Sequence, residues 1–77
     1  MNNQALKLAA VALVLLRLPD VIARVGLSRS EIYRRIALGT FPANLKIGEH
    51  ASAWNAAEVD KWIADRIAER DAKASAA

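Results

Sequence analysis

The side chains best suited to chemistry lie in the middle of the chain, where arginines and hydroxyl groups are interleaved. Residues 28–35 read Ser-Arg-Ser-Glu-Ile-Tyr-Arg-Arg. A guanidinium group binds phosphate oxygens and can donate two parallel hydrogen bonds to guanine, and a hydroxyl group bonds to a phosphate or a base. This combination of residue types predicts a surface that binds a nucleic acid.

On a helical projection, the expected base contact is Arg34. It points away from the apolar face formed by Ile32 and Ile36, and its forked guanidinium matches the acceptors of guanine. Ser30 lies one turn earlier on the same side, where we expect it to meet either a base or a phosphate.

The remaining candidates are expected to hold the phosphate backbone. Arg29 and Arg35 lie at the sides of the same helix. Backbone amides near Ser28 can bind a phosphate oxygen at the helix start, and Lys46 is a further, less specific candidate. The complete set of expected DNA-binding residues is Ser28, Arg29, Ser30, Tyr33, Arg34, Arg35, Lys46 and His50.

Two ring-bearing side chains of this set have alternative interpretations. The ring of Tyr33 lies beside the apolar face, so it either belongs to the core or carries its hydroxyl to a phosphate. His50 either contacts a minor-groove edge or a phosphate, or is a solvated turn residue. Trp54 and Trp62 fall on apolar positions, and we expect both in the core rather than stacked on bases.

Composition disfavours catalytic and metal chemistry. The chain has 77 residues, no cysteine and one histidine, which excludes disulfides, thiolate zinc sites and His-paired metal sites. We therefore expect a binding module and not an enzyme, with no metal ion and no cofactor. Four carboxylates are spread along one expected helix instead of facing one another: Glu58, Asp60, Asp65 and Glu69.

Positive charge is concentrated in the middle third of the chain. Residues 17–46 carry six basic and two acidic residues, a net charge of +4, whereas residues 47–77 carry four basic and six acidic residues, a net charge of −2. Within a chain of net charge +3, this asymmetry predicts one face for an anionic partner.

Two short helices are expected to position the basic residues. Pro19 suits the first turn of a helix that ends at Gly26. Ser28, with Glu31 three residues later, forms a capping box for a second helix, which Gly39 ends. The tight link between the two helices, Gly-Leu-Ser, predicts a helix-turn-helix.

After residue 42 the pattern changes to short strands. Segments 45–47 and 52–54 flank residues 48–51 and predict a hairpin with glycine in its turn. The expected fold class is mainly α with a small β-hairpin wing, a winged helix-turn-helix with helix 28–38 in the major groove and wing 45–54 on the backbone. Asn55 and Glu58 cap a third helix, whose buried stripe is expected to comprise Ala56, Val59, Trp62, Ile63 and Ile67.

The chain begins with an apolar segment whose structure the sequence leaves open. Residues 8–16 are uncharged and apolar, too few to span a bilayer, which needs about 20 residues. No small-residue cleavage site follows, which disfavours a signal peptide. We expect this run to form a helix or strand that packs on the domain or on a second copy. The expected organisation is an apolar extension of uncertain structure over residues 1–14, the DNA-binding domain over 15–70 and a frayed tail over 71–77.

Eight short motifs occur in order: Arg-Leu-Pro-Asp-Val at 17–21, Gly-Leu-Ser-Arg-Ser at 26–30, Ile-Tyr-Arg at 32–34, Gly-x-Phe-Pro at 39–42, Lys-Ile-Gly at 46–48, Trp54, Glu-Val-Asp at 58–60 and Trp-Ile at 62–63. In these motifs, over about residues 15–67, the chain resembles the AlpA family. The resemblance implies a small DNA-binding regulator of a prophage or integrative element, related to excisionases and to the MerR-type winged helix.

The sequence departs from that family pattern in the wing. The family usually has an arginine at the wing tip, where this chain has His50, and further bases where it has Thr40, Ala43 and Ala53. The wing is therefore poorer in positive charge. The apolar extension is also longer than the family pattern, so the resemblance implies nothing about it.

Three functions remain open at this stage. The first is a sequence-specific transcriptional regulator in the cytoplasm, at the bacterial nucleoid, that binds double-stranded DNA as a homodimer or cooperative array and contacts an integrase or polymerase. The second is an excisionase that bends attachment-site DNA through the same face. The third, which we consider weakest, is a protein- or membrane-interaction module that uses the apolar N-terminus; we expect no membrane partner.

Overall fold

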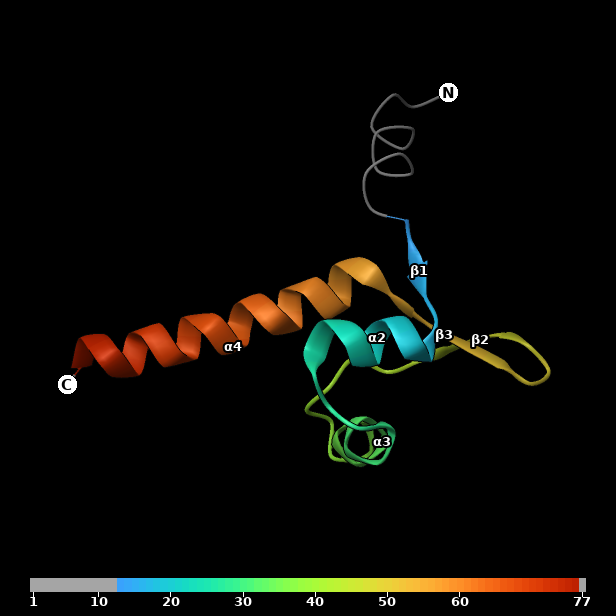
Figure 1. Ribbon diagram of the computed structural model, residues 1–77, viewed down its shortest axis with the longest axis horizontal. Coiled ribbons are helices and arrows are strands. Elements are labelled where there is room, and N and C mark those ends of the chain that lie inside the picture. Colours follow the sequence, from blue (N-terminus) through green and yellow to red (C-terminus); the bar gives the residue numbers. More distant parts are fainter. Residues whose placement is uncertain (1–12, 77) are drawn as a thin grey trace, which may run out of the picture.

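The structure, a computed structural model, describes residues 13–76 and is mostly helical, with a small antiparallel sheet (Figure 1). This confirms the expected fold class, a winged helix-turn-helix. The elements in chain order are β1 (Leu15–Leu16), α2 (Leu18–Val25), α3 (Arg29–Ala37), β2 (Leu45–Gly48), β3 (Ala51–Asn55) and α4 (Ala56–Ala76).

The first helix, α2, ends as its glycine predicts. Gly26 has a φ of 71°, in the left-handed region, and its N–H donates to the carbonyl of Ile22 at 2.9 Å. At the other end, the carbonyl of Arg17 accepts from the amides of Asp20 and Val21. The helix begins at Leu18, one residue before the expected Pro19.

The second helix, α3, uses one half of the expected capping box. The hydroxyl of Ser28 accepts a hydrogen bond from the Glu31 amide at 3.1 Å. The Glu31 carboxylate does not return a bond to Ser28, because it is occupied by two arginines further along the helix. The helix ends at Ala37, and Gly39, with a φ of 76°, turns the chain away.

The sheet has three strands in the order β1-β3-β2, all antiparallel. The β2–β3 hairpin is the wing, and the segment 49–50 forms its turn. The sequence left open whether the apolar run 8–16 forms a helix or a strand, because it lacks the alternation that marks a strand. In the structure its last two residues form β1 and pair with Asn55 and Trp54. The Val14 carbonyl extends this pairing by accepting from the Ala56 amide at 2.8 Å.

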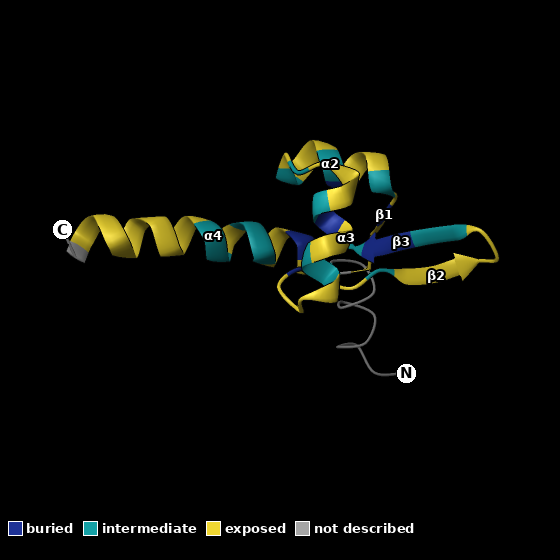
Figure 2. Cartoon of the chain, turned by 90° about the horizontal axis from the view of Figure 1, so that it is seen from below, coloured by how far each residue is buried: buried dark blue, intermediate teal, exposed yellow. Residues whose placement is uncertain are grey.

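The core lies where α2, α3, β3 and the start of α4 meet. Its largest fully enclosed side chains are Val21, Ile32, Trp54 and Val59 (Figure 2). The indole N–H of Trp54 donates to the Pro42 carbonyl at 3.1 Å, which satisfies the one polar group of this side chain. Trp54 is therefore a core residue, as expected.

The last helix, α4, continues well beyond this core (Figures 1 and 2). Its buried stripe ends sooner than predicted: Ile67 is 47 % exposed, because the helix has passed the other elements by that point. The expected fraying over residues 71–77 is also not seen in the described part, since α4 extends to Ala76. Alanine is the best helix former, and neither glycine nor proline follows to stop the helix.

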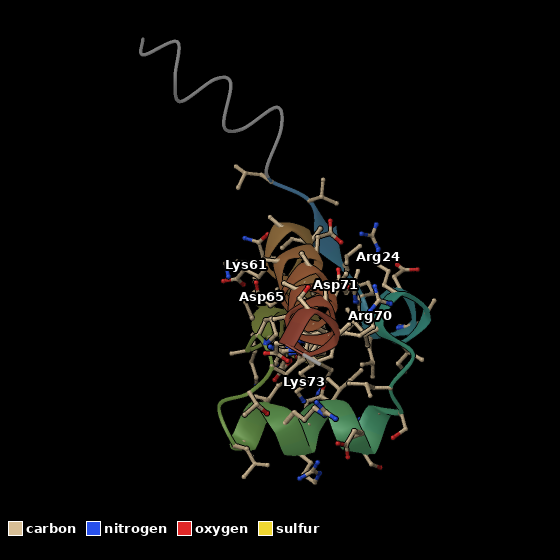
Figure 3. The ribbon with its side chains drawn as sticks, turned by 90° about the vertical axis from the view of Figure 1, so that its left-hand side faces the viewer. Arg24, Lys61, Asp65, Arg70, Asp71 and Lys73 are labelled. Carbon is tan, nitrogen blue, oxygen red and sulfur yellow. The ribbon has the colours of Figure 1, made fainter. Side chains whose placement is uncertain are left out.

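Several ion pairs involve residues of α4, and Figure 3 labels residues from three of them in a view down the helix. Lys61 pairs with Asp65 at 2.8 Å, and Arg24 of α2 pairs with Asp60 at 2.9 Å.

Most of the apolar N-terminal extension, residues 1–12, lies outside the described residues. Leu13 and Val14, the part that is described, are both exposed.

Candidate nucleic-acid interface

Helix α3 lies at one edge of the molecule (Figures 1 and 3). Ile32 is fully buried beneath it, while Ser30 and Arg34 are exposed. Leu38, one turn after Arg34, is 61 % exposed. The structure therefore places the expected outer face of the helix in solvent, where a DNA groove could receive it.

Glu31 holds both arginines of the second half of α3. Its carboxylate accepts from Nε of Arg34 at 2.9 Å and from Nε of Arg35 at 2.8 Å, with a further bond from the Arg34 terminal nitrogen. These hydrogen bonds, first from Arg34 and then from Arg35, lower the pKa of Glu31 to about 2. The same pairing raises the pKa of Arg34.

This clamp has a direct consequence for base recognition. Glu31 neutralises positive charge on α3 that we expected from the sequence to be available to DNA. For Arg34 to fork onto guanine, it must exchange the carboxylate for base acceptors or present a nitrogen that the carboxylate leaves free. The sequence showed the acid and both arginines, and their helical spacing of three and four residues was the signal for this pairing.

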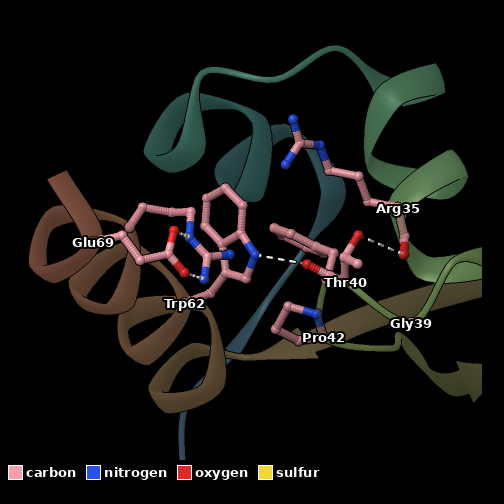
Figure 4. Close-up of a pocket in the computed structure, with 8 residues that line it drawn as sticks. Arg35, Gly39, Thr40, Pro42, Trp62 and Glu69 are labelled. Carbon is pink, nitrogen blue, oxygen red and sulfur yellow. Dashed lines mark hydrogen bonds and ion pairs between the residues drawn. The ribbon is translucent and has the colours of Figure 1, made fainter. Parts of the chain in front are cut away.

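Arg35 points toward α4 and not along the outer face of α3. Its guanidinium lies 5.9 Å from the centre of the Trp62 ring, and its side chain is only 32 % exposed. With Trp62, Arg66 and Phe41 it lines an open pocket of about 650 Å³ between α3 and α4 (Figure 4). The Trp62 indole donates to the Thr40 carbonyl at 2.8 Å.

Tyr33 packs its ring against the core. The ring meets Trp54 edge-on, with centroids 6.1 Å apart, yet the residue remains 37 % exposed. The guanidinium of Arg29 lies 5.8 Å from the centre of the same ring. The two sides of Tyr33 thus face the core and a surface arginine.

A second pocket, which we call the notch, lies between the start of α3 and the wing. Its volume is about 290 Å³. It brings together Arg29, Tyr33 and His50, three residues of the predicted set, and adds Arg17, which the sequence analysis did not select. The lining residues are Arg17, Leu18, Pro19, Arg29, Tyr33, His50, Ser52 and Trp54.

Arg17 enters the notch because its Nε donates to the Ser52 carbonyl of β3 at 3.1 Å. The two residues are 35 positions apart in the sequence. Ser52 is also the register partner of Lys46 on the neighbouring strand β2. The sequence signals for Arg17 were its place in the basic middle third and in the first AlpA-like motif, and neither predicted a contact with the wing.

Pairing with carboxylates divides the basic residues into two groups. Of the ten lysines and arginines between residues 13 and 75, six form ion pairs: Arg24, Arg34, Arg35, Lys61, Arg66 and Arg70. The four without a carboxylate partner in that range are Arg17, Arg29, Lys46 and Lys73. Three of these four belong to the notch or to the wing strands beside it.

The described part of the chain offers little for other kinds of site. Within residues 13–76, no three potential ligands among histidine, aspartate and glutamate are grouped to hold a metal ion. None of the helices in that range is both long and apolar enough to span a bilayer.

Residues 14–67 match the model of a protein family described as "Prophage CP4-57 regulatory protein (AlpA)". The chain belongs to the AlpA family. The AlpA match begins beside β1, includes all eight predicted binding residues and Arg17, and ends at Ile67, where α4 has left the core. The resemblance inferred from the motifs is therefore confirmed.

Two relatives support the AlpA assignment. The chain is 47% identical over 55 residues to "Uncharacterized protein ORF88" of Enterobacteria phage P4, an alignment that covers 71% of this chain and 62% of the phage protein. It therefore spans less than two-thirds of that relative. It is 33% identical over 72 residues to "DNA-binding transcriptional activator AlpA" of Escherichia coli strain K12, covering 86% of this chain and 94% of that protein.

Proposed function

We propose that this chain is a sequence-specific DNA-binding regulator of transcription, carried by a prophage or a related mobile element. The observation that carries the proposal is that three cations without a carboxylate partner within residues 13–75, Arg17, Arg29 and Lys46, lie in the notch or on the wing strand beside it, next to the start of the exposed helix α3. Phosphate binding requires cations that are not already neutralised, and base reading requires an exposed, rigid helix. The E. coli relative is named as a DNA-binding transcriptional activator, and the P4 relative is a phage protein.

In this proposal, α3 lies in the major groove and the wing lies against the backbone. Arg34 reads a guanine, and Ser30 contacts a base or phosphate beside it. The amides at the start of α3, near Ser28, face a phosphate. Of the two sides of Tyr33, only the exposed one is available to DNA.

Arg35 has a smaller role than its position in the sequence suggested. Its contacts with Glu31 and Trp62 hold the guanidinium against the protein. We therefore assign its main contribution to packing between α3 and α4, with phosphate contact through whichever of its N–H groups remain free.

One short recognition helix and a two-stranded wing read few base pairs. We infer that the protein binds as a dimer or cooperative array on repeated half-sites, because a single module gives limited discrimination. A gel-shift titration against duplexes with one and two half-sites tests this inference. A tight one-to-one complex on the single half-site would contradict it.

The proposal is tested by selecting duplexes from a random library and measuring affinity for the selected and random DNA. Arg34→Ala should reduce the difference in binding free energy between the selected and the random duplexes by about 1–3 kcal/mol, because it removes a bidentate base contact. Lys46→Ala should weaken both duplexes alike. A wild-type protein without preference for any duplex would refute the proposed function, and full discrimination by the Arg34 variant would refute the assigned reading residue.

Excision, the alternative that the sequence left open, uses the same surface. The two roles differ in where the binding sites lie and in whether the DNA bends. Footprinting across the promoters and attachment sites of the host element, combined with mobility of circularly permuted duplexes, separates them. Protected promoters with straight DNA support regulation of transcription, whereas bent attachment sites support excision.

A further inference from the structure

The notch has the composition of an anion-binding site. None of its eight lining residues is acidic, and two of them, Arg17 and Arg29, lack a carboxylate partner within residues 13–75. Clustered like charges destabilise a folded chain when nothing compensates them. The rest of the surface shows the usual solution, since six other cations are paired with carboxylates. An anion from outside the chain would supply the missing compensation here.

Arg17 is held in position before any ligand arrives. Its Nε is bonded to the Ser52 carbonyl, which leaves both terminal nitrogens of the guanidinium for another acceptor. Ser52 is in turn fixed by its hydroxyl, which accepts a hydrogen bond from the side-chain amide nitrogen of Asn44 at 3.1 Å. A guanidinium already fixed in this way loses less conformational entropy when it binds.

Arg29 reaches the same pocket from a different element. It lies in the first turn of α3, with its guanidinium over the ring of Tyr33. His50, in the turn of the wing, also lines the notch. Cationic or polar groups therefore converge from the α2 start, the α3 start and the wing. At about 290 Å³ the notch is at the lower limit of small-molecule sites, and a single small anionic group suits it better than an extended ligand.

We propose that the notch binds one phosphate group of the DNA backbone, with Arg17 and Arg29 as its two cationic ligands and His50 as a third donor. This assignment rests on the proposed function. It makes Arg17 a DNA-binding residue and fixes the position of the wing relative to α3 on the duplex, because one phosphate is held from both sides.

The first test measures how affinity depends on salt. Arg17→Gln, Arg29→Gln and the double variant are compared with Lys73→Gln, which removes an equally unpaired charge far along α4. Each phosphate contact contributes about 0.9 to the slope of log affinity against log salt concentration. The double variant should lose about 0.9, not about 1.8, because both arginines hold one phosphate. Between 50 and 200 mM salt, its affinity should then fall about 3.5-fold less than that of the wild type.

The second test locates the phosphate. In a selected duplex, each phosphate is replaced in turn by a neutral methylphosphonate. At one position the wild type should lose affinity, while the double variant should lose none, since its contact is already gone. Absence of any such position would overturn the proposal.

Controls separate a folding defect from a binding defect. Glutamine at position 17 retains an N–H donor for the Ser52 carbonyl, and thermal unfolding by circular dichroism checks that the fold is intact. In the Arg29→Gln background, Arg17→Lys keeps a charge at position 17 and should restore most of the salt slope that Arg17→Gln loses there. If the lysine variant behaved like the glutamine variant, the role of Arg17 would be structural and the proposal wrong.

The outcomes also distinguish this proposal from the proposed function. If the wild type selects a duplex and Arg34→Ala reduces discrimination, but the double variant Arg17→Gln/Arg29→Gln has the same salt slope as Lys73→Gln, only the notch assignment fails. If the wild type selects no duplex and binds random DNA only as weakly as its charge predicts, the proposed function and the notch assignment fail together.

Discussion

Among single residues, Glu31 controls how much positive charge α3 presents. It is bonded to Arg34 and Arg35 at once, so the helix carries two neighbouring arginines with the net charge of one. An arginine without a carboxylate partner would bind any phosphate. An arginine that must first break its hydrogen bonds to a carboxylate does so most readily for a partner whose two acceptors match the guanidinium equally well, such as guanine. Under the proposed function, we therefore expect Glu31 to favour specific over non-specific binding.

The pH dependence of stability offers a test of this clamp. The pKa of Glu31 in the folded protein is about 2, below its ordinary value of 4.5. The ionised carboxylate thus stabilises the fold above pH 4.5, and this contribution is lost as the pH falls from about 4.5 to about 2. Glu31→Gln should make the free energy of unfolding less dependent on pH in that interval, as measured by urea titration.

Glu58 serves as the matched control for that experiment. It is an exposed carboxylate in the first turn of α4, without a side-chain hydrogen bond among the described residues. Glu58→Gln should leave the pH dependence of the free energy of unfolding in that interval nearly as in the wild type. An equal effect of the two substitutions would mean that the arginine pairs contribute nothing in solution.

At the scale of the elements, the angle between helices α2 and α3 depends on a single turn at Gly26. The chain takes a left-handed conformation there, and a Cβ at this position would meet no atom within 4 Å. Substitution is therefore opposed by the backbone conformation and not by crowding. The turn is what lets α2 pack on the core while α3 projects its outer face.

Gly26→Val should destabilise the protein by more than the ~1–2 kcal/mol that left-handed geometry costs an ordinary residue, since valine is β-branched. Gly26→Asn should cost less, because asparagine tolerates this region. Equilibrium unfolding in urea measures both. Comparable stability of the valine variant and the wild type would show that the turn relaxes to another conformation.

For the molecule as a whole, β1 joins the start of the domain to the wing and to α4. Leu16 is buried at 6 % exposure and belongs to the same core cluster as Trp54 and Val59. Its neighbour Leu15 is 51 % exposed. The two residues have the same side chain on opposite faces of one strand, so they form a natural comparison.

Leu16→Ala should lower the free energy of unfolding by about 2–4 kcal/mol, because it leaves a cavity in a very small core. Leu15→Ala should change it by less than about 0.5 kcal/mol, as exposed positions usually do. Thermal or urea unfolding measures the change in the free energy of unfolding for both variants. If the two substitutions had equal effects, β1 would not be packed as described.

Much of the local structure could be predicted from the sequence. The cap at Ser28, the left-handed Gly26 and the hairpin around residues 48–51 depend on neighbours within a few positions, and the structure contains all three. The burial of Ile32 followed in the same way from helical periodicity. Even the clamp of Glu31 on α3 was visible in the spacing of charges.

Only the tertiary structure decided that Arg24 is paired and where the remaining cations meet. Arg17 and Ser52 are far apart in the chain, as are Arg24 and Asp60, and no local pattern encodes either contact. The short strand β1 and the point at which α4 leaves the core were decided in the same way. The amino-acid sequence by itself determined the helices, the turns and the family, because these follow from short-range preferences and motifs. The notch exists only because folding brings three separate segments together.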